Sequence, residues 1–166
     1  MQEQQKCVLI IHNVRSAHNV GSLFRTADGA GIDYIFLTGY TPKPSKKSSV
    51  FTTKAEKELT KTALGAEESV PWKKSSSLSA VLATLREEGY EIVALEQSSK
   101  SVNYKAYIPK EKVALIVGNE VLGVDIKILK QCDVILEIPM WGKKNSLNVS
   151  VAGGIALYHI SSILRG

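Results

Sequence analysis

Apolar strand-like runs alternate with helical patterns along most of the 166-residue chain, and this order constrains the fold strongly. Runs rich in Val, Ile and Leu occupy 7–11, 34–37, 91–95, 113–117 and 134–138, and helical spacing occupies 19–30, 77–88, 125–131 and 148–164. The runs lack a clean apolar–polar alternation, which is typical of strands covered by helices on both faces. The sequence therefore predicts an α/β fold with a mainly parallel sheet flanked by helices.

The size and composition narrow the class of protein. Domains usually take about 100–200 residues, so we expect residues 1–166 to form a single domain. No apolar run approaches the ~20 residues of a membrane span, and the N-terminus lacks the apolar stretch of a signal peptide. Cys7 and Cys132 match no ligand or redox spacing, so we expect reduced thiols in a cytoplasmic protein. The net charge of +5 favours a polyanionic partner.

Cap residues indicate where the first and last helices begin and end. We expect Asn19 to be the N-cap of the first helix and Gly31 to end it. We expect Ser146 or Asn148 to be the N-cap of the last helix. Apolar residues surround much of the last helix, which predicts burial on two sides, either within the core or between the core and a second subunit. One stripe holds Val149, Ala152, Ala156 and Ile163, and another holds Val151, Ile155 and Ile160.

Two polar, irregular stretches, 39–53 and 142–145, follow the predicted strands 34–37 and 134–138. We expect a site at both, because ligands usually bind at the carboxyl ends of parallel strands. The signatures of nucleotide and metal sites are missing. Gly118 and Gly123 have phosphate-loop spacing without the Lys-Ser/Thr pair that should follow. The three histidines lack ligand spacing, so we expect no metal.

Three segments carry candidate functional residues, although each also has an ordinary structural interpretation. Arg25 shares a helix face with Gly21, which either packs closely or lets a ligand or another backbone approach. Glu120 follows a strand and either lies in a solvated turn or helps to hold a polar ligand. Ser146 and Asn148 are either helix caps or ligand contacts.

Taken together and in this order, the segments resemble the three motifs of the SpoU/TrmH family of RNA ribose methyltransferases, within the SPOUT superfamily. The matching residues are Asn19-x-Gly21-x-x-x-Arg25-x-Ala27, Gly118-Asn-Glu120-x-x-Gly123 and Ile138-Pro-Met140-x-Gly142-x-x-x-Ser146-Leu-Asn148-Val-Ser150-Val-Ala152. The resemblance implies a C-terminal trefoil knot, which general folding rules would not suggest. It also implies S-adenosylmethionine as cofactor, a homodimer whose active sites are completed across the interface, and a 2′-O-methylated ribose in tRNA or rRNA as product.

The resemblance also assigns roles to residues. Arg25 would take the proton of the ribose hydroxyl or, because arginine is normally protonated at pH 7, hold the neighbouring phosphate. Asn19 would orient Arg25 or the ribose, and Glu120 would position Arg25. Ser146 and Asn148 would complete the catalytic set. The implied donor-binding residues are Leu95, Gly118, Asn119, Ile138, Met140, Ser146 and Leu147.

The chain departs from larger relatives in ways that bear on RNA binding. Many relatives carry a glycine where this chain has Val121. We expect a catalytic domain alone, with no separate RNA-binding domain, so RNA would contact its own basic surface. The candidates are Arg15, Lys43, Lys46, Lys47, Lys54, Lys143 and Lys144.

Two other functions stay open at this point. The chain could be an RNA-binding protein of this fold that has lost catalysis, although the motif residues are all present. It could also methylate a base or a protein rather than a ribose, although Arg25 in its motif favours ribose. Both tRNA and rRNA stay open as substrates, with tRNA favoured, and the enzyme could act as a free dimer or with an accessory protein.

Overall fold

The computed structural model describes residues 6–166, which build one seven-stranded sheet in the order β3-β2-β1-β6-β4-β7-β5. All its strand pairs are parallel, so the predicted α/β fold with a mainly parallel sheet is confirmed. The strands are β1 (Lys6–His12), β2 (Tyr34–Thr38), β3 (Trp72–Ser75), β4 (Glu91–Leu95), β5 (Val102–Asn103), β6 (Lys112–Val117) and β7 (Val134–Glu137).

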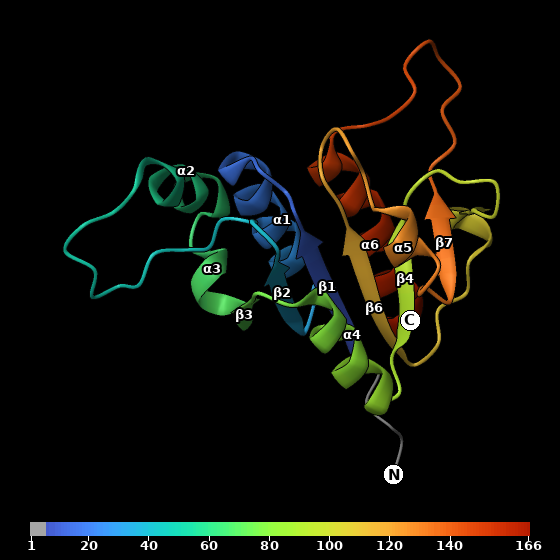
Figure 1. The fold of residues 1–166 in the computed structure, drawn as a ribbon, viewed down its shortest axis with the longest axis horizontal. Helices are drawn as coiled ribbons and strands as arrows, with labels where there is room; N and C mark the ends of the chain where they lie inside the picture. Colours follow the sequence, from blue (N-terminus) through green and yellow to red (C-terminus); the bar gives the residue numbers. More distant parts are fainter. Residues whose placement is uncertain (1–5) are drawn as a thin grey trace.

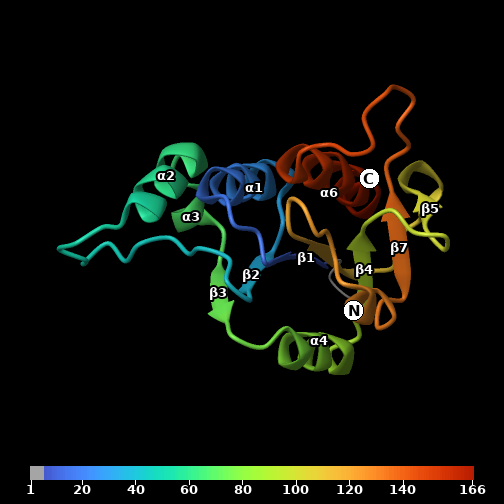
Figure 2. The same cartoon turned by 45° about the horizontal axis from the view of Figure 1, so that its top comes forward.

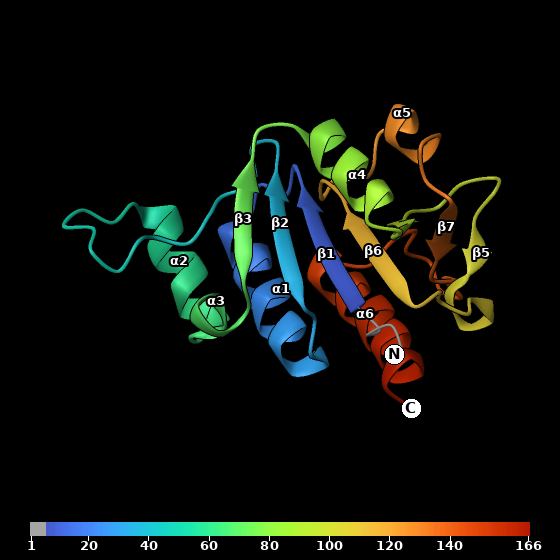
Figure 3. The ribbon, with the colours of Figure 1, turned by 90° about the horizontal axis from the view of Figure 1, so that it is seen from below.

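Helices cover both faces of the sheet (Figures 1 and 2). Figure 3 shows α1, α2, α3 and α6 on one side of the strands and α4 on the other. The helices are α1 (Ala17–Ala30), α2 (Lys54–Ala63), α3 (Ala66–Ser69), α4 (Leu78–Glu87), α5 (Ile126–Leu129) and α6 (Val149–Arg165), with a 3-10 turn, η1 (Tyr104–Ala106). No helix within residues 6–166 is long and apolar enough to span a membrane.

The helices on both faces of the sheet explain why apolar and polar residues do not alternate along the strands. In β1, Leu9 and Ile11 belong to a core cluster with α1 and α6, whereas Val8 and Ile10 belong to a second cluster with α4. Each central strand thus buries both of its faces, and apolar residues are favoured at every position.

The first helix begins earlier than predicted. Ser16, not Asn19, is the N-cap of α1, and its hydroxyl accepts a hydrogen bond from the Asn19 N–H at 3.2 Å. Asn19 lies inside the first turn of α1 with 7% of its surface exposed, and its side chain does not cap the helix. The stop at Gly31 is confirmed, because this residue caps the helix at φ 68°.

The segment 54–75 contains two helices and a strand that the sequence analysis did not predict. The helix α2 is rich in Lys and Glu, and only Leu59 and Ala63 are buried, so its apolar periodicity is weak. It begins with a capping box in which Thr53 and Glu56 each accept a backbone N–H from the other. α2 packs on Gly21, where a Cβ atom would lie 2.4 Å from the Leu59 carbonyl oxygen. The close approach at Gly21 is therefore made by another backbone.

The last helix has one buried face and one exposed apolar face. Ile160 was predicted to share a stripe with Val151, but Ile160 is buried in the core and Val151 is exposed. Ile163 was predicted to share the other stripe with Ala156, but Ala156 is buried and Ile163 is exposed. The exposed stripe instead contains Val151 and Tyr158, which are 51% and 54% exposed. In a single chain α6 is therefore not a central core helix. Its N-cap is Asn148, one of the two predicted residues.

Candidate functional site

A cavity of about 450 Å³ opens at the carboxyl ends of β4, β6 and β7. Its walls come from segments 95–97, 117–124, 136–140 and 145–149, with contributions from α5 and α6. Three segments that are far apart in the sequence therefore meet at one edge of the sheet. All seven residues predicted to bind a donor line this cavity: Leu95, Gly118, Asn119, Ile138, Met140, Ser146 and Leu147.

The loop after β6 is folded tightly against itself. Asn119 and Gly123 exchange backbone hydrogen bonds of 3.1 and 2.9 Å, and the Asn119 side-chain oxygen accepts the N–H groups of Val121 and Leu122. A Cβ atom on Gly118 would lie 2.5 Å from the Gly123 carbonyl oxygen, so this position has no room for a side chain. The glycine spacing of this motif thus builds a rigid wall of the cavity.

Two residues after β4 belong to the site and were missed by the sequence analysis. The Glu96 carboxylate accepts the Val124 N–H at 2.9 Å, and the Gln97 side-chain amide donates to the Asn145 carbonyl oxygen. These bonds connect the loop after β4 to the other two cavity loops. The signal was their position directly after a predicted strand, at the same edge of the sheet.

A polar network joins the three motifs beside the cavity. The Asn148 amide donates to the Asn19 side-chain oxygen at 3.1 Å, and the Asn19 amide donates to Glu120 at 3.3 Å. The Glu120 carboxylate also accepts the backbone N–H groups of Arg15 and Ser16, at 3.1 and 2.9 Å. The network therefore holds the starts of α1 and α6 against the cavity loop.

The hydrogen bonds of Glu120 set its charge. Burial raises the pKa of the carboxyl, but the N–H groups of Ser16 and Arg15 and the Asn19 amide outweigh that effect and hold the pKa below its ordinary value of 4.5. The folded protein therefore favours the carboxylate. The stability that this preference provides is complete above the ordinary pKa and is lost as the pH falls through the lower pKa of the folded state.

We expect Glu120→Gln to lower the melting temperature at pH 7 and to have a progressively smaller effect as the pH falls from 4.5 through the lower pKa of the folded carboxyl, where the wild type also loses the carboxylate. Melting curves between pH 3 and pH 7 measure this. Glu87→Gln, at an exposed residue of α4, controls for the loss of a surface carboxylate. A melting difference for Glu120→Gln that does not change with pH would contradict the proposed charge state.

Arg25 lies apart from this network. It is exposed on α1, and no hydrogen bond or ion pair joins it to Glu120 within residues 6–166 of one chain. Its helix face lies between Gly21, which α2 covers, and Gly29, which lies beside the Tyr158 hydroxyl of α6. Positioning of Arg25 by Glu120 therefore finds no support within one chain.

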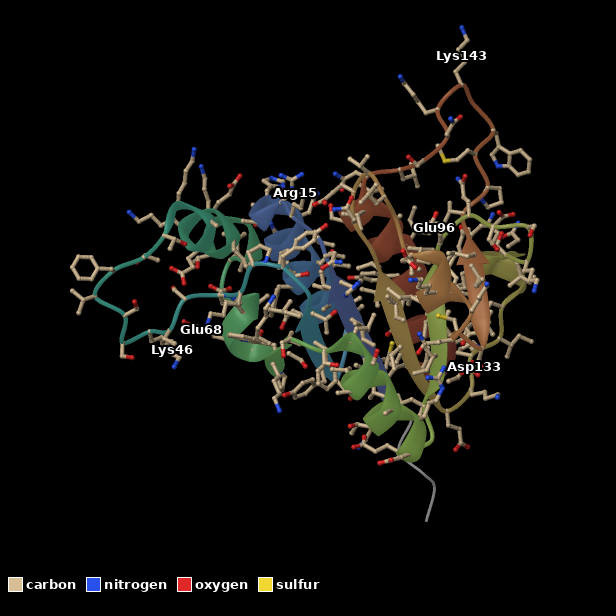
Figure 4. The ribbon with its side chains drawn as sticks, in the orientation of Figure 1. Arg15, Lys46, Glu68, Glu96, Asp133 and Lys143 are labelled. Carbon is tan, nitrogen blue, oxygen red and sulfur yellow. The ribbon has the colours of Figure 1, made fainter. Side chains whose placement is uncertain are left out.

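The predicted basic residues do not gather at one place. Figure 4 shows Lys143 at the tip of the loop after β7, Lys46 on the distant loop after β2, and Arg15 between them near the start of α1. Lys143 and Lys144 are exposed on the loop that lines the cavity. The loop 39–53 does not reach the cavity of the same chain, and Lys47 pairs with Glu68 at 3.0 Å. Of the two predicted site loops, only the second forms part of this cavity.

Comparison with known proteins identifies the family. The model of the SpoU rRNA Methylase family matches residues 6–158. The chain belongs to this SpoU family. A Staphylococcus saprophyticus protein assigned to the TrmH family of tRNA/rRNA methyltransferases is 31% identical over 159 residues, which cover 96% of this chain. The SpoU chain spans 59% of the length of that relative.

Solved structures have the same fold as this SpoU chain. The A. aeolicus TrmH/SpoU tRNA modifying enzyme is 29% identical with a TM-score of 0.80, covering 96% of this chain and 76% of that one. An AdoMet-bound rRNA methyltransferase from Sinorhizobium meliloti is 26% identical with a TM-score of 0.81, covering 95% of this chain and 56% of that one. Among residues 6–166 of the SpoU chain, no group of three His, Cys, Asp or Glu side chains is placed to hold a metal.

Proposed function

We propose that this SpoU-family chain transfers a methyl group from S-adenosylmethionine to a ribose 2′-hydroxyl of tRNA or rRNA. The observation that carries the proposal is that the second and third motifs line one space of about 450 Å³ whose walls include every predicted donor residue. The Asn148–Asn19–Glu120 network ties the first motif to this cavity. Its relatives include an AdoMet-bound rRNA methyltransferase and a tRNA modifying enzyme.

The cavity suits S-adenosylmethionine in size and chemistry. Its volume is in the range of about 300–1,000 Å³ that small-molecule sites occupy. Leu95, Ile138 and Leu147 offer apolar contacts for a nucleobase, and Glu96 and Glu137 place carboxylates in the wall, which favours a ligand that carries positive charge. The bound donor supplies an electrophilic methyl group on a sulfonium sulfur.

The chain's own residues must then activate the acceptor. A ribose hydroxyl is a poor nucleophile, so its proton has to leave as the oxygen attacks the methyl carbon. Arg25 either accepts that proton or holds the adjacent phosphate with its guanidinium. Asn19, Glu120 and Asn148 position the cavity loop and the start of α6, and Ser146 faces the cavity from the loop before α6.

A homodimer is part of this proposal. The exposed apolar stripe of Val151 and Tyr158, together with the half-buried Ile155, lies next to the exposed face of α1 that carries Arg25. If two chains pack through this face, Arg25 is brought to an interface, where the partner's cavity can receive it. We also propose the trefoil knot at the C-terminal part of the chain and a cytoplasmic location. Sedimentation equilibrium tests the dimer, with a mass of twice 18.1 kDa expected.

Methyl transfer from labelled S-adenosylmethionine to total RNA of the host tests the activity. Digestion to nucleosides and mass analysis should give a labelled 2′-O-methylnucleoside, and fractionation of the RNA then distinguishes tRNA from rRNA. A labelled base or protein would replace the ribose assignment with another acceptor. No donor binding by the purified protein would overturn the enzyme proposal and favour an RNA-binding protein.

A further inference from the structure

Trp141 is the most exposed large apolar side chain of the described residues, with 91% of its surface exposed. It follows Met140, which lines the cavity, but Trp141 itself does not line it. The indole therefore lies outside the donor cavity, one residue from its wall. The packing of residues 6–166 gives no reason for a tryptophan at this position.

The same loop carries two positive charges. Lys143 and Lys144 follow Trp141 by two and three residues, and residues 141–148 are all exposed in a single chain. Figure 4 shows Lys143 at the outer end of this loop, pointing away from the sheet. An exposed aromatic side chain and two lysines on one loop supply the two interactions that bind unpaired RNA, which are stacking on a base and contact with phosphates.

We propose that Trp141 stacks on an unpaired nucleobase of the RNA next to the target ribose, while Lys143 and Lys144 contact the flanking phosphates. The proposal rests on the methyltransferase function proposed above. Sequence-specific recognition of RNA mostly targets single-stranded loops and bulges, whose unpaired bases can stack on aromatic side chains. Trp141 offers such an aromatic surface, one residue along the chain from the cavity wall.

Charge favours RNA over a second protein chain as the occupant of this surface. A second copy of this chain also carries a net charge of +5, and its lysine-bearing loop would be repelled by another such loop. For self-association, the candidate surface is the exposed apolar stripe of α6 described above, which includes Val151 and Tyr158. A polyanion gains from both lysines as well as from the ring.

The test compares Trp141→Ala, Trp141→Phe and Trp141→Leu, since phenylalanine keeps an aromatic face and leucine keeps only apolar volume. The probe is polyuridylate, whose binding is followed by quenching of tryptophan fluorescence in the wild type and by filter retention in all variants. We expect Trp141→Ala and Trp141→Leu to raise Kd by roughly 10-fold, within the range for base–aromatic stacking, and Trp141→Phe to stay within about threefold of wild type. KM for the RNA substrate of methyl transfer should rise in the same variants as the Kd for polyuridylate, whereas the Kd for the donor should not change.

The salt dependence separates stacking from charge. Trp141→Ala should weaken binding at every salt concentration without changing the slope of log K against log salt. The variant Lys143→Ala/Lys144→Ala should reduce that slope by about 1.4, since each phosphate contact on a single strand contributes about 0.7. Ile108→Ala, at a residue that is 80% exposed just before β6, is the control for loss of a surface apolar group and should match wild type.

Three results would overturn the stacking role. Equal binding by Trp141→Leu and Trp141→Phe would show that the aromatic face is not used. Loss of donor binding in Trp141→Ala would make the residue a support of the cavity loop, and a change in sedimentation would make it a subunit contact. The polyuridylate assay needs no catalysis, so absence of methyl transfer by the wild type would reject the proposed function without being confused with failure of this proposal.

Discussion

Replacing Arg25 with alanine is expected to lower kcat for RNA methylation by about 100-fold or more while leaving the donor Kd within about twofold. Arg25 is exposed and does not line the cavity of its own chain, so its removal should disturb neither the core nor the donor site. The loss should appear in the step in which the ribose hydroxyl attacks. Single-turnover methyl transfer and calorimetric titration with the donor measure the two quantities.

Arg25→Lys distinguishes the two roles of the guanidinium. Lysine keeps a positive charge without the planar fork, so it should recover much of the RNA affinity if Arg25 holds a phosphate, and little of the rate if Arg25 receives the proton. Arg86→Ala, at an exposed arginine of α4 on the opposite face of the sheet, is the control. Equal losses of donor affinity and rate in Arg25→Ala would show that Arg25 supports the fold instead.

Much of the central fold followed from local patterns. The buried strands were predictable because both of their faces pack under helices, which leaves unbroken Val, Ile and Leu runs such as 113–117. α2 and β3 were not predictable from apolar content, because an edge helix with two buried side chains gives a weak periodic signal. The capping box at Thr53 and Glu56 was the local signal that marked the start of α2.

The site shows the same division between local and long-range information. The motif residues could be named from the sequence, and those of the donor set do share one cavity. Their hydrogen-bond partners could not be named, because the link from Asn148 to Asn19 joins residues 129 positions apart. Asn19 illustrates the difference: its position near a helix start suggested a cap, whereas its buried side chain connects Asn148 with Glu120.

The two motif glycines Gly118 and Gly142 should respond very differently to substitution with alanine. A Cβ atom on Gly118 would lie 2.5 and 2.6 Å from the Gly123 carbonyl oxygen and carbon, whereas a Cβ atom on Gly142 would meet nothing within 4 Å. The atoms at Gly118 are backbone, so the loop 118–123 itself has to move. Such overpacking costs about 1–3 kcal/mol, and the moved loop is a wall of the cavity.

We therefore expect Gly118→Ala to raise the donor Kd by about 30-fold or more and to lower the melting temperature by about 2–12 °C, given a change of about 2–4 °C per kcal/mol for a chain of this size. Gly142→Ala is the matched control and should bind the donor within about twofold of wild type. Calorimetric titration and thermal melting measure both effects. If Gly118→Ala bound the donor as tightly as wild type, the donor would not contact this wall, and the proposed location of its site would be wrong.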